Sequence, residues 1–308
     1  MTPSRRARVV NWFVRNVEKR RLAWAKSPAS LRLGFAIQTA ILFHGPWGSR
    51  YRSATLGGVE ALEVSGFAQT VPDRAQTLLY FHGGGYVMGS PRSHRAMLAH
   101  LSRLTGGVAW LPDYRKAPEH PFPGAIEDAV AAYRALCSRM PAQQIVIGGD
   151  SAGGGVALAL LGEISARGLP QPAGCFAFSP LTDLTFSGAS MRENAGAEAM
   201  LPAARVGELR TLYLDGADPR DPRASPLFAE FSGEVPVWLA VGDSEILLDD
   251  TRRMARYLES QGGDVVLTVG HDLPHAWPMF QGYMPEARAT LEALAGWIKS
   301  LSPPSGES

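Results

Sequence analysis

Beyond residue 75 the chain alternates short apolar runs with longer segments whose apolar residues recur at every third or fourth position. The short runs predict buried strands, and the periodic segments predict helices that pack on them. This alternation favours a mostly parallel central sheet flanked by helices, because each parallel connection needs a crossover. The expected strands are Thr77–Phe81, Val108–Leu111, Gln144–Gly148, Cys175–Phe178, Val235–Val241 and Val265–Val269.

Two parts of the chain do not follow the alternation. Residues 1–50 are mostly helical in pattern, and residues 181–230 hold one helical segment near 203–214 among proline-rich turns. We expect both parts to cover the sheet as a lid rather than to enter it. The helices expected on the sheet carry apolar stripes over Met97–Leu104, Ile126–Leu136, Val156–Ile164, Leu247–Leu258 and Leu291–Leu301.

Charge and cysteine content exclude several classes of protein. The 30 basic and 29 acidic residues nearly balance, so no strong overall field attracts nucleic acid, and we expect no nucleic-acid partner. The two cysteines, Cys137 and Cys175, fall in a helical and a strand pattern, where each is expected as a small buried apolar residue rather than in a disulfide.

The N-terminal segment is basic and amphipathic. Its apolar run is interrupted by Asn11, Arg15 and Asn16, unlike the core of a signal peptide, and no apolar run in the chain reaches the roughly 20 residues that span a bilayer. We therefore expect a cytoplasmic protein without stable membrane association. The segment is interpreted as a cap over the core, and contact with a membrane surface is the alternative.

The segment Gly149-Asp150-Ser151-Ala152-Gly153 fits the G-x-S-x-G pattern of a nucleophile elbow. In such an elbow a serine sits on a tight turn between a strand and a helix, and its hydroxyl projects above the sheet. An expected strand ends just before the motif and an expected helix begins just after it, as the elbow requires. The alternative is a glycine-rich turn with an incidental serine.

His82-Gly83-Gly84-Gly85 follows the strand Thr77–Phe81 and matches the HGGG-type loop that completes an oxyanion hole in lipases and esterases. We assign the oxyanion donors to the amides of Gly83, Gly84 and Ala152. The alternative, a phosphate-binding loop, lacks both the G-x-G-x-x-G pattern and a Walker lysine. His82 is expected to orient the loop rather than to act as a base.

A nucleophilic serine needs a histidine to remove its proton and a carboxylate to orient that histidine. Downstream of Ser151 the candidates for the base are His271 and His275, and those for the acid are Asp243 and Glu245. All follow expected parallel strands, so their loops meet at one carboxyl edge of the sheet, where open α/β sheets bind ligands.

Three blocks in order resemble the bacterial hormone-sensitive lipase-like esterases of the α/β-hydrolase fold. They are His82–Tyr86, the segment Asp113–Pro123 and Gly149–Gly154. The resemblance runs from about Gly57 to about Lys299. It implies that His275, in Leu273-Pro274-His275-Ala276-Trp277, is the base. It also implies that Glu245 of Glu245-Ile246-Leu247-Leu248-Asp249-Asp250 is the acid, where aspartate is more common, with Asp243 as the alternative.

The family resemblance also implies a division of the chain. Residues 51–302 are expected as the catalytic domain, residues 1–50 as a helical cap to which 181–230 contribute, and residues 303–308 as a flexible tail. Tyr86, Val87 and Met88 are expected to line the substrate pocket, with burial in the core as the alternative. The resemblance further suggests a buried ionic cluster beneath the site, formed by Asp113, Arg115, Glu119 and His120.

Together these features predict a serine carboxylesterase that hydrolyses short-chain esters through an acyl-enzyme on Ser151. No metal or organic cofactor is implied. The expected partner is a small-molecule ester, and a homodimer is left open. The alternatives are hydrolysis of an amide, thioester or lactone on the same triad, or a relative that binds a small molecule without catalysis.

Overall fold

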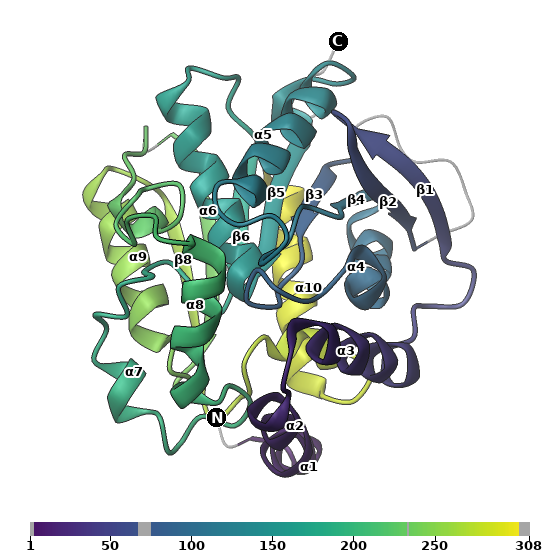
Figure 1. Ribbon diagram of the computed structural model, residues 1–308. Helices are drawn as coiled ribbons and strands as arrows, with labels where there is room; N and C mark the ends of the chain where they lie inside the picture. The colour runs from purple at the N-terminus through teal and green to yellow at the C-terminus, as the bar shows by residue number, and fades with distance from the viewer. Residues whose placement is uncertain (1–2, 67–74, 233, 302–308) are drawn as a thin grey trace.

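The computed structural model describes residues 3–66, 75–232 and 234–301. Its centre is an eight-stranded sheet of order β1-β2-β4-β3-β5-β6-β7-β8 (Figure 1). β2 is antiparallel to β1 and to β4, and every other neighbouring pair is parallel. The strands are β1 (Arg50–Leu56), β2 (Val59–Ser65), β3 (Thr77–Phe81), β4 (Ala109–Pro112), β5 (Ile145–Asp150), β6 (Gly174–Phe178), β7 (Val237–Gly242) and β8 (Val265–Gly270).

Every residue of the central strands β3, β5, β6 and β7 is buried, because helices cover both faces of the sheet. The six strands expected from the apolar runs all form, and the mostly parallel sheet is confirmed. The sequence pattern missed the β1–β2 hairpin, in which most residues of β1 are exposed. Gly57 and Gly58 form its two-residue turn with φ of +58° and +86°, values that favour glycine.

Two groups of helices enclose the sheet. α5 (Gly124–Cys137), α6 (Ser151–Ala166) and α9 (Leu248–Ser260) contribute to one apolar core. α4 (Pro91–Thr105) and α10 (Pro285–Ser300) contribute to a second core on the other face, together with Val10 and Val14 near the N-terminus. This arrangement places the carboxyl ends of β3, β5, β7 and β8 at one open edge, where the candidate residues lie.

A helical cap stands over that edge. Its N-terminal part consists of α1 (Arg5–Phe13), a π-helical turn (Val14–Glu18), α2 (Lys19–Trp24) and α3 (Pro28–Leu42) (Figure 1). Residues 181–230 add α7 (Ser190–Glu193) and α8 (Val206–Leu214). Within the described part of the chain, no helix is long and apolar enough to cross a membrane. The predicted tail, residues 303–308, lies outside the described residues.

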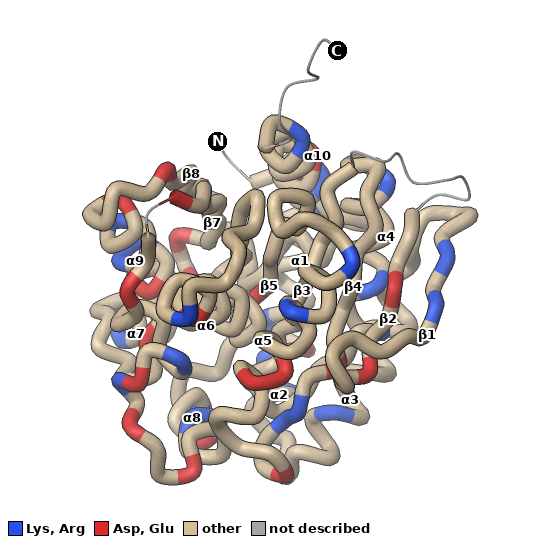
Figure 2. Tube along the Cα trace, turned by 90° about the horizontal axis from the view of Figure 1, so that it is seen from above, with Lys and Arg blue, Asp and Glu red and all other residues tan. Residues whose placement is uncertain are grey.

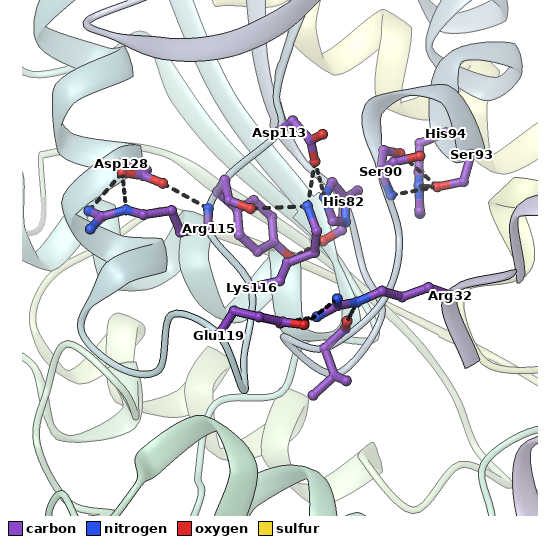
Figure 3. A network of polar contacts seen from close by, with 12 residues as sticks. Arg32, His82, Ser90, Ser93, His94, Asp113, Arg115, Lys116, Glu119 and Asp128 are labelled. Carbon is purple, nitrogen blue, oxygen red and sulfur yellow. Dashed lines mark hydrogen bonds and ion pairs between the residues drawn. The ribbon is translucent and has the colours of Figure 1, made fainter. Parts of the chain in front are cut away.

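Arg32 joins the cap to the part of the chain that contains the sheet. From α3 its guanidinium donates to the carbonyl oxygens of Val87 and Ala117, each at 2.8 Å, and its Nη1 donates to Glu119 Oε1 at 2.8 Å (Figure 3). Hydrogen bonds from one planar guanidinium to three acceptors fix the orientation of the helix better than a single ion pair does. α3 is therefore held against the loop that follows β3.

Candidate active site

Ser151 occupies the turn between β5 and α6, with a φ of +53°. The neighbouring chain comes so close that a Cβ on Gly149 would lie 2.2 Å from the carbonyl oxygen of Gly153. A Cβ on Gly153 would lie 2.1 Å from the carbonyl oxygen of Phe81. Glycine is therefore required at both positions, and the strained turn directs the Ser151 side chain toward the cap.

His275 and Glu245 form a buried pair behind Ser151. Nδ1 of His275 lies 2.6 Å from Oε2 of Glu245, and the two side chains are 4% and 1% exposed. The other carboxylate oxygen accepts hydrogen bonds from the Gly242 amide at 2.6 Å and from the Ser179 hydroxyl at 2.7 Å. With Nδ1 donating to the carboxylate, Nε2 is left as the basic nitrogen of the neutral ring.

His271 and Asp243 form a second, separate pair. Nδ1 of His271 lies 2.6 Å from Oδ2 of Asp243, but the two side chains are 60% and 35% exposed. Neither residue lines the cavity over Ser151, whereas His275 does. The two alternatives that the sequence left open are thus two different pairs, and the geometry favours His275 and Glu245.

The electrostatic surroundings of His275 suit a base. Burial by itself lowers the pKa of the imidazole, but the charge of Glu245 and the hydrogen bond to it act in the opposite sense. More distant charges on Glu198 and Asp150 also raise it, so the pKa of His275 lies above its ordinary value. The protonated imidazole, which forms when His275 accepts a proton as a base, is therefore stabilised.

The oxyanion loop departs from the sequence prediction at one residue. The amide of Gly83 donates to Oδ1 of Asp150 at 2.9 Å, so it is not free to bind an oxyanion. Among the described residues, the amides of Gly84 and Gly85 donate to no protein acceptor. Ala152 is the second residue of α6 and lies in its first turn, where amides have no partner within the helix. The free donors are therefore the amides of Gly84, Gly85 and Ala152.

Asp150 connects the elbow to the oxyanion loop. Besides the Gly83 amide, its Oδ1 accepts from the Tyr80 hydroxyl at 2.8 Å and lies 3.1 Å from Nε2 of His94. Burial would raise the pKa of Asp150, but the charge of His94 and the hydrogen bonds from His94, Tyr80 and Gly83 outweigh it, and the pKa is lowered. The carboxylate thus stays ionised and holds the loop beside Ser151.

A cavity of about 130 Å³ lies under the cap, and Ser151, His275, Gly84 and Gly85 line it. The described residues show no hydrogen bond between the Ser151 hydroxyl and His275; such bonds often tighten only when substrate binds. Most of the wall is apolar and comes from both parts of the cap and from the loop after His275. It includes Leu22, Leu31, Phe35, Leu209, Met279 and Phe280.

Two of the three predicted pocket residues line this cavity. Tyr86 and Met88 do so, and the ring of Tyr86 stacks on Tyr213 with 3.7 Å between centroids. Val87 does not: its side chain is fully buried in the apolar core that includes α5, α6 and α9, and only its carbonyl oxygen meets the cap, through Arg32. The prediction for Val87 is wrong because the tight turn after Gly85 points its side chain inward.

The expected buried ionic cluster beneath the site is instead a set of separate, partly exposed pairs (Figure 3). Arg115 pairs with Asp128 at 2.8 Å, and Glu119 pairs with Arg32 of the cap. His82 is fully buried and stacks on Tyr114 with 4.4 Å between centroids. Burial lowers the pKa of His82, which suits a neutral ring that supports the loop.

The chain is similar to known hydrolases over most of its length. A family model described as the alpha/beta hydrolase fold matches residues 78–279. An acetyl-hydrolase of Streptomyces hygroscopicus is 34% identical over 297 residues, which cover 95% of this chain and 94% of that protein. An esterase of Acinetobacter venetianus is 34% identical over 81% of this chain and 82% of that protein.

A crystal structure of an esterase from the bacterial hormone-sensitive lipase family superposes with a TM-score of 0.90 at 34% identity, covering 98% of this chain and 99% of the other. This chain belongs to the bacterial hormone-sensitive lipase family. As a member of that family it is a carboxylic ester hydrolase of the α/β-hydrolase fold, and both the predicted fold and the predicted enzyme class are confirmed.

Sequence patterns did not single out three further residues that support the site of this hormone-sensitive lipase family member. Asp150 was noticed only as part of the elbow motif. Ser179 donates to Glu245 and accepts from the Ala276 amide at 3.1 Å, so it ties the acid to the loop of the base. Glu198 is buried, and its Oε2 accepts from the Ile246 amide at 3.0 Å. Burial and the charge of Glu245 raise its pKa.

Replacing Asp150 with alanine is expected to lower kcat about 100-fold, the usual effect of losing one oxyanion donor, because the loop would lose its anchor beside Ser151. KM should change less, since the apolar wall is untouched. Steady-state kinetics on a soluble ester measure both constants. Asp150→Asn keeps one acceptor oxygen and serves as the control, which should retain more activity. A folded Asp150→Ala variant with the wild-type kcat would contradict this role.

Proposed function

We propose that this esterase hydrolyses short-chain carboxylic esters by a serine mechanism with an acyl-enzyme on Ser151. The observation that carries the proposal is the placement of Ser151 and His275 on one cavity wall, with Glu245 hydrogen-bonded to the far nitrogen of the imidazole. A hydroxyl, a base and an orienting carboxylate in this order are the parts that acyl transfer needs.

In the first half-reaction Nε2 of His275 accepts the Ser151 proton while the serine oxygen bonds to the ester carbonyl carbon. The carbonyl oxygen becomes an oxyanion and receives hydrogen bonds from the amides of Gly84, Gly85 and Ala152. When the intermediate collapses, the carbon–oxygen bond to the alcohol breaks and His275 returns its proton to the leaving oxygen. Water then repeats these steps on the acyl-enzyme and releases the carboxylic acid.

The size of the cavity supports small acyl groups. Its volume of about 130 Å³ is below the roughly 300–1,000 Å³ of pockets that hold drug-sized ligands, which favours a small acyl group. The largely apolar wall suits an alkyl chain rather than a charged acid. The name of the similar acetyl-hydrolase also supports acetyl and other short acyl esters as substrates.

The test is a panel of p-nitrophenyl esters with acyl chains of two to twelve carbons, together with an alkyl phosphonate that reacts with activated serines. We expect kcat/KM to be highest at two to four carbons, and the matched anilide of the best acyl group to react more slowly. Peptide mass spectrometry should locate the phosphonate on Ser151. A modified residue other than Ser151, or a maximum at the longest chains, would contradict the proposal.

A further inference from the structure

Exposed apolar side chains gather on the N-terminal part of the cap. Among the described residues, thirteen large hydrophobic side chains are exposed, and eight of them lie within the first 50 residues. Trp12, Trp24 and Trp47 are 65%, 75% and 98% exposed. Three solvent-exposed tryptophans in one segment are unusual for a surface that contacts only water. The full set is Val9, Trp12, Val17, Trp24, Leu33, Ile37, Ile41 and Trp47.

Apart from Trp47, which follows α3, these side chains lie on the outer faces of helices whose inner faces are buried. In α1, Arg5, Arg8, Val9 and Trp12 follow the i, i+3, i+4, i+7 spacing of one helix face, and all four are exposed. The opposite face is buried and includes Ala7, Val10 and Val14. Each helix face thus has its own role: one covers the core, and the other presents tryptophan beside arginine.

The same division continues in α2 and α3. Arg20 and Trp24 lie one turn apart and are exposed, and Leu33, Ile37 and Ile41 form an exposed stripe with a spacing of four residues. The inner side of α3 lines the cavity with Leu31, Phe35 and Gln38. Arg21 of α2 lies against Gly34 of α3, where a Cβ would come within 2.4 Å of its Nη1, so the two helices are neighbours.

Charge is segregated in the same way. The first 50 residues hold ten Lys and Arg but one acidic residue, a net charge of +9; since the whole chain carries +1, the remaining residues carry −8. Many of the carboxylates lie on the side of α7 and α9 (Figure 2). Arg5, Arg6, Arg8 and Arg20 are exposed and make no ion pair with any described residue.

We propose that the outer face of α1, α2 and α3 docks reversibly on an anionic phospholipid surface. Tryptophan places an apolar ring and a polar N–H at the headgroup level. Arginine extends its guanidinium to the phosphates while its methylene groups lie along the apolar surface. A second copy of this chain fits the face less well, because a symmetric dimer would bring two +9 segments into opposition.

Docking of this kind goes beyond the proposed hydrolysis and does not depend on it. The helices would lie in the plane of the headgroups, as their alternating inner and outer faces require. Because the attraction combines apolar burial with exposed charges, salt should weaken it. The cavity under the same helices would then be held next to a lipid phase from which apolar esters can partition.

The test is co-sedimentation of the full-length protein with vesicles of phosphatidylcholine alone or with 30% phosphatidylglycerol, at low and high salt. We expect binding only to the anionic vesicles, a blue shift of tryptophan emission, and release by salt. Arg8→Gln/Arg20→Gln should weaken binding about 25-fold, since each charge near a membrane surface contributes about fivefold. Trp12→Ser/Trp24→Ser should weaken it by at least about tenfold.

The matched control is Arg252→Gln/Arg256→Gln on α9, which removes the same charge away from the cap and should leave vesicle binding unchanged. Hydrolysis of a soluble ester should stay the same in all three variants, because none of these side chains lines the cavity. The proposal fails if the wild-type protein does not sediment with anionic vesicles, or if the control loses binding equally. It also fails if the protein is a dimer in solution that protects Trp12 and Trp24.

Discussion

Replacing Ser151 with alanine is expected to lower kcat by about 10⁴- to 10⁶-fold, the largest effect of any single change in this chain. The serine oxygen forms the acyl bond, and the remaining amides and base stabilise only a slow direct attack by water. Hydrolysis of p-nitrophenyl acetate by enzyme purified free of host esterases measures the loss. The variant should also no longer react with the phosphonate.

Folding should be unaffected in this variant. Alanine has a similar volume, keeps the same strained φ of +53° and removes a hydroxyl that makes no hydrogen bond to a described residue. The midpoint of thermal unfolding should therefore agree with that of Ser53→Ala, a matched control at an exposed serine of β1 whose hydroxyl makes no hydrogen bond to a described residue. A stable Ser151→Ala protein with wild-type activity would exclude Ser151 as the nucleophile.

Replacing Glu245 with glutamine is expected to lower kcat by about 10³- to 10⁴-fold. The carboxylate accepts three hydrogen bonds, from His275, from the Gly242 amide and from the Ser179 hydroxyl. A glutamine offers one acceptor oxygen, and its NH₂ group would face Nδ1 of His275. The ring would then carry its proton on Nε2, where it cannot accept the proton of Ser151.

The pH dependence of the residual activity gives a second readout. In the wild-type enzyme kcat/KM should fall as the pH drops through the raised pKa of His275, above the ordinary value of about 6.5, because the base must be neutral. In Glu245→Gln burial still lowers that pKa while the charge of Glu245 is gone. The acid limb should therefore move to lower pH as the maximal rate falls.

Asp243→Asn is the matched control, since it removes the other carboxylate that pairs with a histidine in the same region. The pair of Asp243 and His271 is partly exposed and lies off the cavity, so kcat should stay within about twofold of the wild type. If kcat falls strongly in Asp243→Asn and not in Glu245→Gln, the assignment of Glu245 as the acid is wrong.

The sequence predicts the interior of the fold better than its edge. Fully buried parallel strands are continuous apolar runs, so the ends of β3 and β6 were placed within one residue of those in the structure. β1 carries Arg50, Arg52 and other exposed residues and has no such run. Its only local signal was the glycine pair at its turn, and pairing with β2 is a tertiary event that periodicity does not reveal.

In the candidate site, too, the sequence predicts the residues of local motifs better than those that only the fold brings together. Ser151 and the glycine loop belong to short motifs whose backbone geometry requires particular residues, so a local pattern identifies them. The Gly83 amide was assigned to the oxyanion because nothing in the sequence indicates that it already donates to Asp150. Ser179 and Glu198 meet Glu245 from 66 and 47 positions away in the chain, and no spacing rule connects them.

The attachment of Arg32 has a consequence for how the cap and the catalytic rate are linked. Its guanidinium binds the carbonyl oxygen of Val87, two residues after the glycine loop, and that of Ala117, whose amide donates to the Tyr86 carbonyl at 3.0 Å. Lifting α3 must break these bonds, so we expect movement of the cap to loosen the loop that carries the oxyanion amides. Grafting an α3 that lacks this arginine would then slow turnover of every ester by a common factor, whatever its acyl chain.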